Sequence, residues 1–138
     1  MAGLKPVIID ASALIAVLSK ADQWHRFAAR AFTALPKPFI TCESVISECC
    51  FMLNPARRRE TFQMIRDGII QVDFSLSDEV ERIEHLMAKY DSVPMSLADA
   101  CLVRLSEIFG SPIFTFDGDF GIYRRHGKQP IPILGMDI

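Results

Sequence analysis

The stretch Pro6-Val7-Ile8-Ile9-Asp10-Ala11-Ser12 decides the fold, because an apolar run ends abruptly in a carboxylate and passes into the apolar segment 13–18. A short run rich in β-branched residues is typical of a parallel strand that is covered on both faces. We therefore predict a buried strand followed by a helix, with Asp10 at the carboxyl end of the strand. Open α/β sheets bind ligands outside that edge, so Asp10 is placed for chemistry. Aspartate is also a preferred N-cap, and Asp10 could serve only to begin the helix.

The rest of the chain continues to alternate strands with helices. Apolar runs predict further strands at 39–42, 69–74, 111–116 and 131–134, and two segments of helical periodicity precede each of the first three. Helices between successive strands favour right-handed crossovers and parallel strands. We predict an α/β protein in which residues 1–138 form a single domain. Its three layers, α/β/α, would surround a central, mainly parallel sheet of four to five strands.

Composition and charge narrow the class of protein. Half of the 138 residues are hydrophobic and 23% are charged, which is typical of a globular domain. A net charge of -2 argues against a protein that binds nucleic acid through bulk positive charge, although a local basic patch stays open. Four cysteines without a CxxC motif fit reduced thiols, and no apolar segment is long enough to span a membrane. We therefore expect a cytoplasmic protein without membrane contact.

Three more acidic residues occupy positions that such a sheet could bring to Asp10. Asp117 ends its strand as Asp10 ends the first one, and the two strands could lie side by side. Asp99 lies in the first turn of a helix that begins after Ser96. Glu48 falls at the margin of the buried face of a helix over about 44–53. The predicted inward residues of that helix are Val45, Cys49, Met52 and Leu53.

Each of these acids also has a purely structural interpretation. Ser96 followed by Asp99 matches a capping box. Asp117-Gly118-Asp119 matches an Asx-type turn. Glu48, taken alone, would be an ordinary surface glutamate. The sequence leaves these interpretations open beside the functional one.

Four carboxylates in one place would have an electrostatic consequence. Two unit charges about 4 Å apart repel by about 4 kcal/mol at an effective dielectric near 20, so the cluster needs protons or a cation. Oxygen ligands without paired His or Cys favour Mg²⁺ or Mn²⁺ over Zn²⁺, and Mg²⁺ held by carboxylates typically serves phosphate chemistry. The pattern favours metal-assisted hydrolysis of phosphodiester bonds.

Taken together, the acidic motifs resemble those of the PIN domains, and especially the VapC-like ribonucleases of bacterial toxin-antitoxin pairs. The motifs are Asp10-Ala11-Ser12, Glu48, Leu97-Ala98-Asp99-Ala100 and Thr115-Phe116-Asp117-Gly118-Asp119-Phe120. The resemblance covers the whole chain, in order and at compatible spacing. It implies a PIN-like fold, Mg²⁺- or Mn²⁺-dependent cleavage of RNA and a homodimer. For the toxin of a type II pair, it also implies an antitoxin that covers the site.

The resemblance also implies roles for individual residues. Asp10, Glu48, Asp99 and Asp117 would be catalytic and metal-binding, Asp119 an additional or substitute metal ligand, and Ser12 and Thr115 site-lining hydroxyls. Some relatives carry one more acid where this chain has Ser96, so the number of metal ions stays open.

Two basic groups are candidates for guiding RNA, because an acidic site repels phosphate and needs positive charge nearby. One group precedes the middle of the chain and the other lies in a loop near its end. Their members are Arg57, Arg58 and Arg59, and Arg124, Arg125 and Lys128. The alternative is that these residues form only a solvated face.

Other classes of protein fit the sequence less well. A receiver domain requires paired acids after the first strand, a phosphorylatable Asp on a central strand and a late Lys, none of which this chain offers. A haloacid-type phosphatase requires Asp where this chain has Ser12. The stronger rival is a PIN-fold module without catalytic activity that binds RNA or a protein partner.

Overall fold

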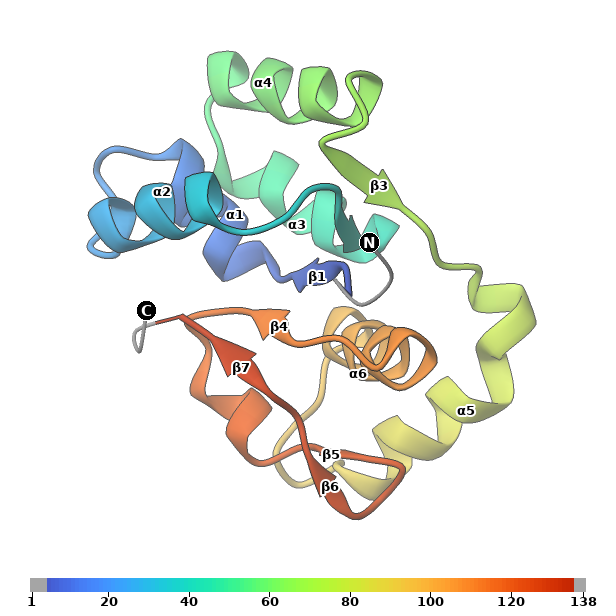
Figure 1. Ribbon diagram of the computed structural model, residues 1–138. Coiled ribbons are helices and arrows are strands. Elements are labelled where there is room, and N and C mark those ends of the chain that lie inside the picture. The colour runs from blue at the N-terminus through green and yellow to red at the C-terminus, as the bar shows by residue number, and fades with distance from the viewer. Residues whose placement is uncertain (1–4, 136–138) are drawn as a thin grey trace.

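The computed structural model describes residues 5–135, and its centre is a five-stranded sheet with the order β3-β2-β1-β4-β7 (Figure 1). Every neighbouring pair of strands is parallel. The strands are β1 (Val7–Ile9), β2 (Phe39–Thr41), β3 (Ile70–Val72), β4 (Ile113–Phe114) and β7 (Ile133–Leu134). The predicted fold class, with four to five mainly parallel strands, is therefore confirmed.

Six helices of the described chain flank this sheet. They are α1 (Ala11–Leu18), α2 (His25–Ala34), α3 (Glu43–Met52), α4 (Pro55–Arg66), α5 (Leu76–Lys89) and α6 (Leu97–Phe109). The helix α1 packs against α2 and α3, whereas α5 packs against α6. In the view of Figure 1, α1–α4 occupy the upper left of the molecule and α5 with α6 the lower right. The chain therefore wraps the sheet with one helix layer from its first half and one from its second.

Local sequence signals set several of the helix ends. The Asn54 side chain caps α4 by accepting a hydrogen bond from the Arg57 N–H at 2.9 Å, and Pro55 follows in the first turn, where its missing N–H costs nothing. Gly110 ends α6 with a φ of 65°, in the left-handed region that favours glycine. Asn54 and Pro55 thus set the start of α4, and Gly110 sets the end of α6, the helix that carries Asp99.

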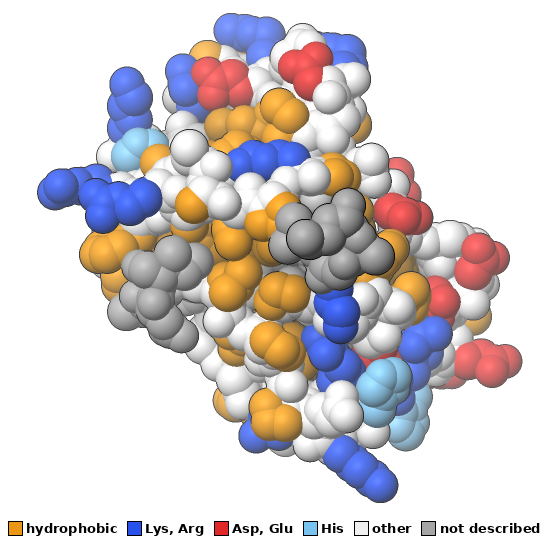
Figure 2. Space-filling view, viewed as in Figure 1, with side chains coloured by type: hydrophobic (Ala, Val, Ile, Leu, Met, Phe, Trp, Pro, Cys, Tyr) orange, Lys and Arg blue, Asp and Glu red, His pale blue; other side chains and the backbone are white. Residues whose placement is uncertain are grey.

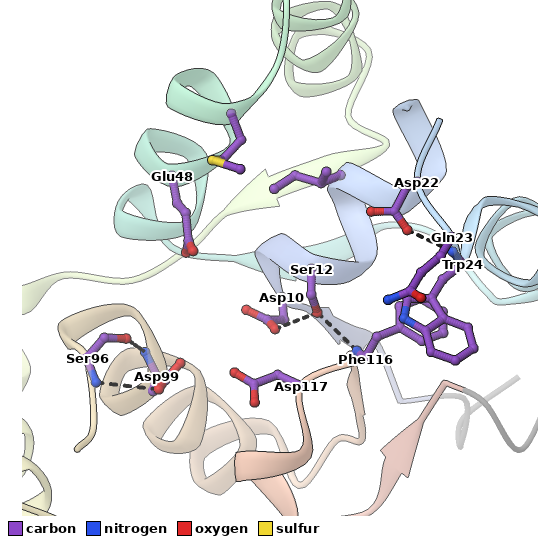
Figure 3. A pocket seen from close by; sticks show the side chains of 12 residues that line it. Asp10, Ser12, Asp22, Gln23, Trp24, Glu48, Ser96, Asp99, Phe116 and Asp117 are labelled. Carbon is purple, nitrogen blue, oxygen red and sulfur yellow. Dashed lines mark hydrogen bonds between the residues drawn. The ribbon is translucent and has the colours of Figure 1, made fainter. Parts of the chain in front are cut away.

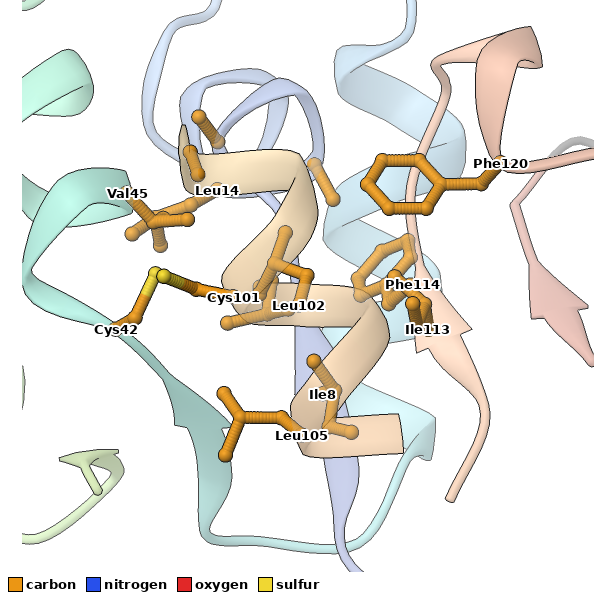
Figure 4. Packing of buried hydrophobic residues seen from close by; sticks show 14 of the residues in the cluster. Ile8, Leu14, Cys42, Val45, Cys101, Leu102, Leu105, Ile113, Phe114 and Phe120 are labelled. Atoms are coloured by element: carbon orange, nitrogen blue, oxygen red, sulfur yellow. The ribbon is translucent and has the colours of Figure 1, made fainter. Parts of the chain in front are cut away.

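The core lies between β1 and the helices packed on it. All three residues of β1 are buried, as their continuous apolar run predicted. Figure 4 shows Leu102 and Leu105 of α6 close to Ile8 of β1, with Phe114 of β4 beside them. These side chains are fully buried, and each Leu buried in this way contributes about 1.5–3 kcal/mol. The packing holds α6 against the central strand and so fixes the position of its first turn.

Two details of the predicted elements are wrong. Met52 was expected to face inward from α3, but its side chain is 63% exposed because the helix ends at this residue. The basic segment 124–128 was expected to be a loop, but Arg124–Arg125 and Gln129–Pro130 pair as an antiparallel hairpin, β5 and β6. Among residues 5–135, no helix is long and apolar enough to cross a membrane.

Candidate active site

The site lies where the two central strands end. β1 and β4 are parallel neighbours with Ile9 opposite Phe114, and the Asp10 N–H donates to the Phe114 carbonyl at 3.1 Å. Asp10 and the segment 115–117 therefore leave the sheet side by side. This adjacency follows from the order of the strands, which places the first strand next to the last long apolar run of the chain.

Asp10 is a buried carboxylate, and both of its oxygens accept hydrogen bonds from the protein. Its Oδ1 accepts the Ala11 N–H at 2.7 Å and caps α1, while its Oδ2 accepts the hydroxyls of Ser12 and Thr115 at 2.9 Å and 2.7 Å. Burial, with a smaller contribution from the charge of Asp99, raises the pKa of Asp10 to about 6 despite these hydrogen bonds. Capping thus does not exclude a functional role for Asp10, because the carboxylate that caps α1 is also buried and costly to ionise.

Asp99 enters the site from the first turn of α6, where the predicted capping box forms. The Asp99 N–H donates to Ser96 Oγ at 3.0 Å, and the Ser96 N–H donates to Asp99 Oδ2 at 3.4 Å. The Tyr123 hydroxyl donates to the same Oδ2 at 2.9 Å. Burial and the charge of Asp117 raise the pKa of Asp99. Within the described residues the protein's donors all meet Oδ2, so Oδ1 is left for another ligand.

Asp117 and Glu48 complete the acidic group. Asp117 is joined to the first strand through Thr115, whose Oγ1 accepts the Asp117 N–H at 2.9 Å. Asp117 Oδ1 also accepts the Asp119 N–H at 2.9 Å, so the predicted Asx-type turn forms and opens the short 3-10 helix η1 (Gly118–Gly121). Glu48 extends from α3, and its partial burial, together with the charges of Asp99 and Asp117, raises its pKa. The carboxyl groups thus repel one another across the site.

These side chains line one pocket of about 460 Å³. Figure 3 shows Asp10, Glu48, Asp99 and Asp117 pointing toward a common space from four different elements. The pocket volume falls within the range of about 300–1,000 Å³ typical of ligand sites. Its full lining comprises Asp10, Ser12, Ile15, Asp22, Gln23, Trp24, Glu48, Met52, Ser96, Asp99, Phe116 and Asp117. The structure therefore brings together residues that are separated by up to 107 positions in the chain.

Two predicted site residues, Thr115 and Asp119, do not line the pocket. Thr115 is 2% exposed and does not line the pocket, but it holds Asp10 and Asp117 through its hydroxyl. Asp119 is also absent from the lining, and in the turn its backbone N–H donates to Asp117 Oδ1. The metal-binding role of Asp119 stays a prediction.

The oxygen atoms that line the pocket are of the kind that a hard divalent cation prefers as ligands. The pocket offers carboxylate and hydroxyl oxygens, and neither His nor Cys lines it. Among residues 5–135, however, no three acidic, His or Cys side chains already converge closely enough to hold a metal ion. Side chains would therefore have to rearrange around a cation. Glu48 is only partly desolvated, its side chain being largely exposed, and it accepts no hydrogen bond from residues 5–135, so it has the freedom to move.

The six predicted RNA-guiding residues all lie outside this pocket. Arg57 pairs with Glu60 at 2.7 Å, and Arg58 Nε donates to the Leu53 carbonyl at 3.0 Å. Figure 2 shows Lys and Arg side chains mixed with acidic ones at the top of the molecule, over α4. In the hairpin, the Arg124 and Arg125 guanidinium groups donate to backbone carbonyls of the chain itself. Guidance of RNA by these residues stays a prediction.

Arg59 and Lys128 allow the cleanest test of guidance, because both are exposed and neither side chain has a hydrogen-bond or ion-pair partner within the described residues. If either residue contacts RNA phosphate, charge reversal by Arg59→Glu or Lys128→Glu should weaken RNA binding and reduce the slope of log affinity against log salt by about 1. Fluorescence anisotropy with labelled RNA over a salt series measures both quantities. An unchanged affinity and slope would leave that residue as part of a solvated face.

Sequence reasoning missed several residues of the site. Tyr123 fixes Asp99 Oδ2, and Trp24, Gln23 and Met52 line the pocket. Tyr123 follows the acidic turn by four residues, a spacing that signals nothing until η1 is known to fold the chain back onto α6. Trp24 lies in the turn before α2. From the sequence, an aromatic residue there is interpreted equally well as part of the apolar stripe of the helix as it is as a pocket residue.

Comparison with known proteins agrees with this fold. The chain is similar in structure to VapC20 of Mycobacterium tuberculosis, a toxin that cleaves the sarcin-ricin loop. The TM-score is 0.73 and the sequence identity is 23%, over 84% of this chain and 93% of that chain. No curated protein matches the sequence. The family model of the PIN domain matches residues 7–125, which is well over half of the chain, so the protein belongs to the PIN domain family.

Proposed function

We propose that the protein is a metal-dependent ribonuclease that hydrolyses RNA phosphodiester bonds, and that it is the toxin of a type II toxin-antitoxin pair. The observation that carries the proposal is the meeting of Asp10, Glu48, Asp99 and Asp117 in one pocket outside the carboxyl ends of β1 and β4. A cluster of acids with raised pKa values is costly to the folded protein, and a divalent cation offsets that cost.

Asp10, Glu48, Asp99 and Asp117 would hold Mg²⁺ or Mn²⁺, with Asp119 as an additional ligand. When bound, such a cation polarises a phosphoryl oxygen and lowers the pKa of a water molecule so that the water can attack phosphorus. The chain itself prepares the ligands. Ser12 and Thr115 fix the Asp10 carboxylate, and Tyr123 fixes Asp99 so that Oδ1 stays available. Fixed ligands reduce the reorganisation needed when charge develops during the reaction.

The comparisons support the choice of RNA as the substrate. VapC20, which shares the fold of this chain, is a toxin that cleaves the sarcin-ricin loop, and this chain itself matches the PIN domain family. By the same likeness we propose an antitoxin protein as a partner, a homodimer as the assembly and the cytoplasm as the location. Four free cysteines fit a reducing compartment. Cleavage of the same loop does not follow, because substrate choice depends on residues around the pocket.

Mg²⁺ or Mn²⁺ at millimolar concentration should raise the melting temperature of the purified protein. Binding relieves carboxylate repulsion in the folded state only, and a ligand present at 100 times its Kd stabilises by about 2.7 kcal/mol. For a domain of this size the shift should be about 5–10 °C. Differential scanning fluorimetry after chelator treatment measures it, with the exposed-site variant Asp67→Asn as a control that keeps the shift. An unchanged melting temperature together with no heat of metal binding would contradict the shared metal site.

The toxin role can be tested separately from catalysis. A short reading frame directly upstream in the source genome should encode a DNA-binding segment and an apolar tail. Its product, copurified with this chain, should suppress RNA cleavage. Cleavage that persists undiminished in a stable complex would argue for a processing nuclease instead of a toxin.

A further inference from the structure

The pocket that contains the carboxylates also has an aromatic side, made by Trp24 and Phe116 and called here the aromatic wall. The two rings stack with centroids 5.5 Å apart and 3° between their planes. Both residues are half-buried and line the pocket. Figure 3 shows Trp24, Phe116 and the neighbouring Gln23 on the side of Asp10 and Asp117 that faces away from Glu48 and Asp99. One cavity therefore joins a flat apolar surface to an acidic one.

Hydrogen bonds hold the aromatic wall in a fixed place relative to the acids. The Phe116 N–H donates to Ser12 Oγ at 3.0 Å, and the Ser12 hydroxyl in turn donates to Asp10 Oδ2 at 2.9 Å. The Trp24 N–H donates to Asp22 Oδ1 at 2.8 Å. The imidazole Nδ1 of His25 lies 2.8 Å from the Ala16 carbonyl of α1, which ties this turn to the first helix. A wall that is ordered before binding costs little conformational entropy when a ligand arrives.

We propose that the aromatic wall is a subsite for one unpaired nucleobase of the substrate, adjacent to the phosphodiester bond that the acidic side engages. The proposal rests on the proposed function in taking RNA as the ligand. Stacking of a base on an aromatic side chain contributes about 1–3 kcal/mol and tolerates any base, because every base has a π face. Gln23 is exposed at the same side and offers an amide donor and acceptor to a base edge.

The proposal restricts the class of RNA. A base in a duplex is stacked and paired, so it is not free to enter the pocket, whereas bases of loops, bulges and single strands are. A nucleotide is favoured over a basic peptide because it satisfies both sides of the pocket, with its ring on the wall and its phosphate at cation-bound carboxylates. A basic peptide would neutralise the acids directly and would compete with the cation. The experiment below separates these two ligands.

Trp24 is the only tryptophan of the chain, so intrinsic tryptophan fluorescence reports on the aromatic wall alone. Stopped-flow mixing of the full-length protein in Mg²⁺ with a single-stranded hexaribonucleotide should quench this fluorescence saturably before cleavage. A matched RNA with abasic positions should bind more weakly and quench less, and a fully paired duplex should not quench. No quenching by single-stranded RNA, or equal quenching by RNA with and without bases, would overturn the subsite. Quenching by an arginine-rich hexapeptide but not by RNA would also overturn it, in favour of a protein partner.

Substitution of Trp24 gives an independent test. Trp24→Leu should lower kcat/KM on single-stranded RNA about 5- to 150-fold, mainly through KM, because stacking holds the substrate. Trp24→Phe keeps a ring and should lose less. Phe62→Leu is the matched control, since Phe62 is 43% exposed on α4 and does not line the pocket. Trp24→Leu activity equal to that of Phe62→Leu would overturn the proposal.

The two tests also separate the subsite from the proposed function. Cleavage by the wild type without fluorescence quenching would reject the subsite and keep the ribonuclease. Quenching by single-stranded RNA without any cleavage would keep the subsite and reject the ribonuclease. Should Trp24→Leu fail to fold, the fluorescence experiment still decides, because it uses the unaltered chain.

Discussion

Asp99→Asn protein is expected to fold like the wild type and to cleave RNA at least about a hundredfold more slowly. Asparagine can accept the Ser96 N–H and the Tyr123 hydroxyl as Asp99 does, so the capping box and the end of α6 should survive. What the substitution removes is a charged ligand, and metal ions contribute several kcal/mol to the stabilisation of transition-state charge. At about 1.4 kcal/mol per factor of ten, that loss amounts to two orders of magnitude or more.

The assay compares initial rates of cleavage of a labelled RNA in Mg²⁺ or Mn²⁺, with circular dichroism as the test of folding. Asp67→Asn is the matched control. Asp67 is exposed at the end of α4, just before β3 begins, and so lies toward the amino ends of the strands, opposite to the edge that carries the acids. If Asp99 only caps α6, both variants should keep full activity. Full ribonuclease activity in folded Asp99→Asn protein would therefore reject the catalytic assignment.

Asp10→Asn is expected to make the metal-free protein more stable at neutral pH, by up to about 3 kcal/mol. Burial raises the pKa of Asp10 from 3.8 to about 6, so ionisation above pH 6 costs the folded state roughly that amount. The folded protein holds the Asp10 proton more tightly than the unfolded chain does. Its contribution to stability is therefore complete below about pH 4 and is lost as the pH rises through 6. Asparagine keeps an acceptor for the Ala11 N–H without carrying a charge.

Urea denaturation in chelator at pH 4 and pH 8 measures this difference. The free energies of unfolding of wild type and Asp10→Asn should be close at pH 4, whereas the variant should be clearly more stable at pH 8. Saturating Mg²⁺ should narrow the gap at pH 8 by stabilising the wild type alone. A variant that is less stable than wild type at pH 8 in chelator would mean that Asp10 is chiefly a helix cap.

The positions of Asp10, Asp99 and Asp117 could be predicted because each follows from a local rule. Asp10 and Asp117 end apolar runs, and parallel strands end at one edge. Asp99 is placed by its capping box with Ser96, a pattern that can be recognised in the sequence alone. In all three cases the structural interpretation also proved correct, since the caps and the turn form. The structural interpretation of an acid therefore does not exclude the functional one. Asp99, for example, completes the capping box through Oδ2, while its Oδ1 receives no protein donor among the described residues.

The surroundings of the acids could not be predicted, because they depend on contacts between distant elements. Tyr123 reaches Asp99 only after η1 turns the chain back, and Trp24 meets Phe116 across 92 positions of sequence. Met52 has the spacing of a buried residue, but the helix ends there and the side chain lies at the pocket instead. Arg124 and Arg125 were predicted to lie in a loop, as candidates for guiding RNA or as part of a solvated face. In the structure both guanidinium groups donate to backbone carbonyls that only the folded chain presents.

The most direct test of the acidic pocket as a ribonuclease site is cleavage of RNA by chelator-treated wild-type protein, with and without added metal. The substrates should include total RNA and short single-stranded RNAs, resolved on denaturing gels. The account predicts no cleavage in chelator, and cleavage on addition of Mg²⁺ or Mn²⁺. Intact RNA in every metal condition, or cleavage that chelator does not reduce, would contradict it.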